Sequence, residues 1–130
     1  MSISPRGVAL ACTLALAAPA VAQSGSGWHG IGQSVAPADA GSVTVTTHAE
    51  TNNHEFMVCI EGHIMRVNQA TLHFEGGGTQ MMRISERVAD GGCSAGKSLN
   101  IRNHALESVD VTYDQALLAG GSARVQLFVR

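Results

Sequence analysis

The segment ESVDVTYD (residues 107–114) alternates apolar and polar side chains with a period of two. Its apolar residues are Val109, Val111 and Tyr113, and short polar residues stand between them. Successive side chains of an extended chain point to opposite sides, so this alternation predicts a β-strand with one buried face. The β-branched residues support the same interpretation.

The same pattern recurs along most of the chain and predicts an all-β fold. Strong candidates are SVTVTTH (42–48), EFMVCI (55–60), ATLHFE (70–75) and ARVQLFVR (123–130); weaker ones are TQMMRIS (79–85) and KSLNIRN (97–103). Glycine clusters at 76–78, 91–92 and 120–121 separate these segments, and only DQALLAG (114–120) is briefly helical in pattern. About seven to eight short strands predict an antiparallel β-sandwich, with a jelly roll as one arrangement that fits.

The first 22 residues have the layout of a secretory signal peptide. Arg6 precedes an apolar run over residues 8–18, and a small-residue site at 20–22 follows before Gln23. The run is shorter than the roughly 20 apolar residues that a membrane-spanning helix needs. We expect cleavage after Ala22, a periplasmic or secreted protein, and no transmembrane segment after cleavage. The alternative is a retained N-terminal anchor.

Residues 23–41 are rich in Gly, Ser, Ala and Pro and have no periodicity. This composition predicts a flexible N-terminal segment, in which Trp28 and Ile31 could still pack on the domain. The predicted β-sandwich domain covers residues 42–130.

Two of the three cysteines, Cys59 and Cys93, would remain after signal cleavage. In an oxidising compartment such a pair usually forms a disulfide. Alternatives are a metal-bound thiolate pair, which needs further ligands, and a redox couple, which usually has a C-x-x-C spacing. A disulfide across this loop would stabilise the fold by about 3–4 kcal/mol in the chain-entropy model.

The composition argues against polyanionic partners. The formal net charge is −2, aromatic residues make up 4% of the chain, and the sequence has no basic run. Nucleic acids and anionic membrane surfaces are therefore not expected as partners.

The segment GGCSAGKS (91–98) matches the phosphate-loop pattern G-x-x-x-x-G-K-[ST]. A working phosphate loop joins a buried strand to the start of a helix. Here the following segment, LNIRNHALESV (99–109), continues like a strand, so we interpret the match as a coincidence within a glycine-rich surface loop.

The segment HEFMVCIEGHIMRV (54–67) is rich in soft and imidazole donors, which exported copper proteins favour. Candidate ligands are His54, Met57, His63, Met65, His73, Met81 and Met82. Strand alternation places Met57 and Cys59 opposite the apolar residues, and a turn at Gly62 would return His63 and Met65 on a paired strand, where some donors could converge. The competing interpretation is that these side chains simply pack on strands. No cofactor is predicted otherwise.

Catalytic signatures are missing from the sequence. It contains neither the nucleophile elbow G-x-S-x-G nor the zinc motif H-E-x-x-H. Acidic residues such as Glu107 and Asp110 have no distinguishing context, so we expect a protein that is not an enzyme. A small hydrolase or isomerase would require a concave pocket with a perturbed His or acid.

Three segments, MVCIEGHIMRVNQATLHFEGGGTQMMRISERVADGGCS (57–94), SLNIRNHALESVDVTYD (98–114) and ARVQLFVR (123–130), resemble a family of small exported bacterial proteins. The family is a domain of unknown function with a GG-[CS]-[ST] loop, a V-x-V/L-x-Y strand and a terminal V-x-L-[FYW]-x-R. The resemblance covers roughly residues 56–130 and implies export, a β-sandwich and a Cys59–Cys93 bond. It supplies no catalytic or ligand residues, and NIRNHALESV (100–109) departs from the family pattern.

The sequence therefore favours an exported, disulfide-stapled β-sandwich with a non-enzymatic binding or envelope-accessory role. Its partner would be an unknown protein or envelope ligand. The alternative is a periplasmic copper- or metal-binding protein that uses His and Met side chains.

Overall fold

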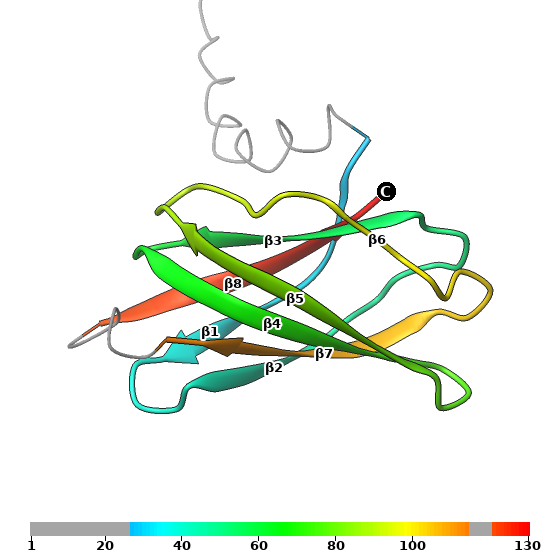
Figure 1. Cartoon of the computed structure of the whole chain (residues 1–130), viewed down its shortest axis with the longest axis horizontal. Coiled ribbons are helices and arrows are strands. Elements are labelled where there is room, and N and C mark those ends of the chain that lie inside the picture. The colour runs from blue at the N-terminus through cyan, green and yellow to red at the C-terminus, as the bar shows by residue number, and fades with distance from the viewer. Residues whose placement is uncertain (1–26, 115–120) are drawn as a thin grey trace, which may run out of the picture.

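The computed structural model describes residues 27–114 and 121–130. The predicted signal peptide, and all of DQALLAG except Asp114, lie outside the described residues. Eight strands form two four-stranded antiparallel sheets that pack as a sandwich (Figure 1). The strands are β1 His29–Pro37, β2 Ser42–Thr46, β3 Glu55–Glu61, β4 Met65–Phe74, β5 Thr79–Val88, β6 Lys97–Ser98, β7 Leu106–Tyr113 and β8 Ser122–Val129. The all-β sandwich predicted from the sequence is confirmed.

The two sheets have the strand order of a jelly roll. Sheet A runs β1-β8-β3-β6, and sheet B runs β2-β7-β4-β5. First pairs with last, second with seventh, third with sixth and fourth with fifth, as in one long hairpin rolled up across two layers. Every connection except β4–β5 therefore passes from one sheet to the other.

This topology corrects the predicted pairing after Gly62. Gly62 does turn the chain, with φ 100°, but β3 pairs with β6 and β8, whereas β4 pairs with β5 and β7. The residues after Gly62 thus cross to the opposite sheet instead of returning beside β3. A local turn residue does not determine which sheet the next strand joins.

The core lies between the sheets and follows the alternation of the strands. On β7, Val109 and Val111 are fully buried and Tyr113 is nearly so. The largest fully buried side chains are Phe56, Ile60, Met65, Leu72 and Leu127. Each comes from the apolar positions of β3, β4 or β8, which explains why period-two patterning predicted these strands.

Strand β1 corrects the predicted flexible segment. Residues 29–37 pair with β8 along its whole length, and Trp28, Ile31 and Ala36 are buried. The glycines that suggested flexibility serve close packing: a Cβ at Gly32 would lie 2.5 Å from the Thr46 carbonyl oxygen. The domain therefore includes β1, and the prediction of a flexible segment is wrong for these residues.

The two weaker strand candidates differ in outcome. TQMMRIS lies within the ten-residue strand β5, whereas KSLNIRN contributes only the two residues of β6.

Candidate functional site

Cys59 of β3 and Cys93 of the β5–β6 loop form a disulfide. The bridge links adjacent extended segments, flanked by hydrogen bonds from Ile60 N to Gly92 O (2.9 Å) and from Ser94 N to Val58 O (2.7 Å). Cys59 is buried with Trp28, Met57 and Phe128 in a small apolar cluster on the outer side of sheet A. The pair predicted from the sequence is thus a structural bond inside a packed cluster.

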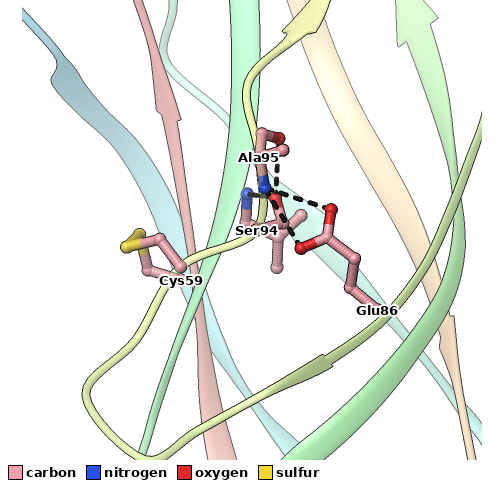
Figure 2. Close-up of a disulfide and its surroundings, with 6 residues drawn as sticks. Cys59, Glu86, Ser94 and Ala95 are labelled. Atoms are coloured by element: carbon pink, nitrogen blue, oxygen red, sulfur yellow. Dashed lines mark hydrogen bonds between the residues drawn. A yellow bond between two sulfur atoms is a disulfide. The ribbon is translucent and has the colours of Figure 1, made fainter.

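The loop that contains Cys93 is also attached to sheet B. The Glu86 side chain of β5 accepts hydrogen bonds from Ala95 N at 3.1 and 3.3 Å, as Figure 2 shows beside the disulfide. Lys97 and Ser98, the last letters of the phosphate-loop match, form strand β6 rather than the start of a helix. The match is therefore a coincidence, as predicted.

The predicted metal ligands are dispersed over the sandwich. Met65 and Met82 lie in the core, and Met57 lies in the cluster outside sheet A. His73 and Met81 are on the outer side of sheet B, and His54 is exposed. The Nδ1 atom of His63 lies 2.8 Å from the carbonyl oxygen of Ile64. Residues on two outer faces and in the core cannot share one ion. Among the described residues, no group of three His, Cys, Asp or Glu side chains could hold a metal ion.

One end of the sandwich has an open cavity of about 320 Å³ beside the start of β1. His29, His48, Glu50 and Asn53 line it. Within the residues that the structure describes, these side chains form no hydrogen bonds with one another. The cavity therefore lacks a paired acid and base.

The outer face of sheet B is a polar surface ordered by strand register. Three rows cross its four strands: Ser42–Thr112–Gln69–Arg83, Thr44–Asp110–Thr71–Met81 and Thr46–Ser108–His73–Thr79. All of these side chains except Met81 are polar, and none belongs to the core. We call these twelve residues the sheet B face.

Asp110 lies at the centre of the sheet B face and orders its neighbours. Its Oδ1 accepts a hydrogen bond from the Thr44 hydroxyl at 2.6 Å, and its Oδ2 lies 2.8 Å from His73 Nε2. The hydrogen bonds from Thr44 and then from His73 hold the pKa of Asp110 below its usual value. Asp110 therefore fixes two side chains from the adjacent strands.

Three arginines form a basic group at one end of this face. Arg66 of β4 lies directly opposite Arg87 of β5, and Arg83 lies four residues before Arg87 on the same strand, beyond the register shift. All three are exposed, and the Asp114 N–H donates a hydrogen bond to the Arg66 carbonyl oxygen at 3.0 Å. The β4–β5 register shifts here, and Ser85 adopts a left-handed φ of 50°. We call Arg66, Arg83 and Arg87 the arginine patch.

The sequence did not reveal this patch, because its members are scattered along the chain and join only when β4 and β5 pair. The available signal was the alternation in TQMMRISERV (79–88), which places Arg83 and Arg87 on the polar side of one strand.

A family model described as "Domain of unknown function (DUF2541)" matches residues 9–129. The chain belongs to this family. The family resemblance found from the sequence is thereby confirmed, and the match spans both sheets of the DUF2541 domain. No curated protein matches the chain.

The DUF2541 protein is also similar to a solved structure titled "Structural and functional characterization of Pseudomonas aeruginosa AlgX". The two are 12% identical with a TM-score of 0.51, over 78% of this chain and 26% of that chain. The chain thus spans about a quarter of that protein, and the likeness concerns the fold alone. No helix among the described residues is long and apolar enough to cross a membrane.

Proposed function

We propose that this DUF2541 protein is an exported, non-enzymatic binding module and that the sheet B face is its binding surface. The observation that supports this proposal is the uncovered sheet B face itself, on which Asp110 holds Thr44 and His73 in place. A polar face with fixed donors and acceptors can recognise a ligand without a large conformational change on binding.

The setting of the Asp110–His73 pair favours binding over catalysis. Catalytic groups usually converge in a concave site that excludes water. The pair instead lies on an open sheet surface, with side chains 43% and 38% exposed, and the cavity beside β1 is lined by other residues. Export is supported by the N-terminal layout and by the disulfide, because disulfides persist in oxidising compartments.

The proposal can be tested by affinity capture from envelope extract with the oxidised mature protein. Thr71→Tyr would place a bulky ring in the centre of the sheet B face, while Gln33→Tyr makes the same change on the exposed outer side of sheet A. We expect the first variant to lose a captured component that the wild type and the second variant retain.

Two results would contradict the proposal. Capture that survives Thr71→Tyr but fails with Gln33→Tyr would place binding on sheet A. A turnover that disappears when one polar residue is replaced would show that the protein is an enzyme.

A further inference from the structure

Met81 is the one apolar member of the sheet B face, and it is 68% exposed. It lies on β5, the last strand of sheet B in the part of the chain that the structure describes, so it has a neighbouring strand on one side only. Thr71 is its direct neighbour on β4, and Thr79 and Arg83 flank it along the same face of β5. The thioether of Met81 is therefore accessible to small molecules in the folded protein.

The other methionines of the described residues are buried. Met65 is 0% exposed, Met82 is 5% exposed and Met57 is 6% exposed. Met82 is the most informative of these, because it adjoins Met81 in the sequence while the alternation of β5 turns it into the core. A reagent that attacks thioethers reaches these three only when the surrounding structure opens, and opening of core strands is rare. Reaction at Met81 needs no opening.

Oxidation of a thioether by a peroxide needs little beyond access to the sulfur. The sulfur lone pair attacks one oxygen of hydrogen peroxide, so an S–O bond forms while the O–O bond breaks. The sulfur is oxidised by two electrons, and the second oxygen leaves as water after taking the proton of the first. The product, methionine sulfoxide, is polar where the thioether was apolar. The two cysteines among the described residues are already joined, so no thiol there competes for the oxidant.

We infer that Met81 is the site at which peroxide modifies this protein, and that the sulfoxide weakens binding by the sheet B face. The inference rests on the proposed function and adds its regulation. Met81 ends the row Thr44–Asp110–Thr71–Met81, so a ligand that covers this row contacts its side chain. After oxidation the same ligand must displace water from the sulfoxide oxygen, which costs binding free energy unless a donor replaces that water.

The fold should tolerate this modification. Met81 is mostly exposed, so its sulfoxide is hydrated in the folded protein much as it is in the unfolded chain. Surface changes of this kind usually alter stability little, and the melting temperature should stay within about 3 °C of that of the unmodified protein. A sulfoxide at Met65 would instead place a polar group in the core. Oxidation at Met81 therefore changes the binding surface without changing the structure beneath it.

The first test identifies the site of modification. The disulfide-bonded protein is treated with hydrogen peroxide, and tandem mass spectrometry follows the sulfoxide at Met81 and at Met82. We expect Met81 to react about tenfold or more faster in the folded protein, because Met82 must wait for opening of the core. In urea the two rates should become equal, which is the internal control. Equal rates in the folded protein would overturn the inference.

The second test measures binding. Protein with about half of its Met81 oxidised is passed over immobilised envelope extract, and the bound and unbound fractions are compared by mass spectrometry. We expect the ratio of sulfoxide to thioether at Met81 to be about fivefold or more lower in the bound protein. Met82→Leu is the matched control, because it removes the adjacent sulfur on the core side and should leave this depletion unchanged.

Met81→Leu has no thioether at this position, so peroxide treatment should not change the amount of this variant that binds. Equal sulfoxide in the bound and unbound fractions of wild type, or a peroxide-dependent loss of binding in Met81→Leu, would overturn the inference.

The proposed function is judged by a separate result. If Thr71→Tyr loses capture while bound and unbound wild type carry equal sulfoxide at Met81, the sheet B face binds its ligand and the inference alone fails. If Thr71→Tyr retains capture, the proposed function fails, and the effect of oxidation on binding fails with it.

Discussion

Gly32 of β1 lies directly against β2. A Cβ there would lie 2.5 Å from the Thr46 carbonyl oxygen and 3.2 Å from a Val45 methyl group. Both neighbours belong to a paired strand, so neither can move freely. A side chain as small as Ala therefore forces the two sheets apart at this corner.

We predict that Gly32→Ala lowers the free energy of unfolding by about 1–3 kcal/mol, the usual cost of overpacking. Urea denaturation followed by the fluorescence of Trp28, the single tryptophan, measures the loss. Gly30→Ala is the matched control, because its Cβ would lie an ordinary 3.4 Å from the Phe128 ring. Equal losses in the two variants would show that β1 is not held closely against β2.

Asp110 gives a pH-dependent prediction at the same scale. Its folded-state pKa is lowered, so its contribution is present above the unfolded pKa near 4 and is lost as the pH falls through the folded value. Asp110→Asn should therefore cost up to about 1 kcal/mol at pH 7, since the group is partly exposed. The difference between variant and wild type should disappear in acid. A difference in urea midpoint that persists after the pH has fallen through both the unfolded and the folded pKa of Asp110 would contradict this account.

At the scale of elements, the loop between β5 and β6 connects sheet B to sheet A. It contacts β3 in sheet A and β5 in sheet B. The disulfide and Ser94 attach it to β3, while the Glu86 carboxylate attaches Ala95 to β5. The two-residue strand β6 therefore depends on contacts made by its preceding loop.

Replacing Glu86 tests this attachment. Glu86→Ala should cost about 0.5–1.5 kcal/mol, the net value of a hydrogen bond, and should speed amide exchange at Ala95 and Ser94. Glu86→Gln retains an acceptor oxygen and should preserve most of the protection. Unchanged exchange in Glu86→Ala would mean that the disulfide alone holds the loop.

Sequence patterning predicted the strands that bury one face and keep an unbroken alternation of apolar and polar residues, such as β7 and β8. It missed β1, because HGIGQSVAP has few β-branched residues and is buried by its contacts with β8 and β2. It named Asp110 without seeing its role, since Thr44 and His73 reach it from other strands. The arginine patch depends on the pairing of β4 with β5, which is a long-range property that no local window contains.

For the whole molecule, the disulfide is the main covalent constraint on a small domain. Its two cysteines are separated by 34 positions. Reduction, or Cys59→Ser with Cys93→Ser, should lower stability by about 2–5 kcal/mol. Each kcal/mol corresponds to roughly 4–8 °C in melting temperature for a domain of this size. Non-reducing mass spectrometry should find the two peptides linked, and a free thiol at Cys59 or Cys93 in the folded protein would contradict the assignment.

The position of β8 between β1 and β3 has a consequence for biosynthesis. Synthesis runs from the N-terminus, so the strand that both neighbours need is made after the other strands that the structure describes. Until residues 122–129 are made, sheet A lacks the strand that joins β1 to β3, so the sandwich cannot be completed. Premature termination just before this point would lose the whole layer rather than a dispensable tail.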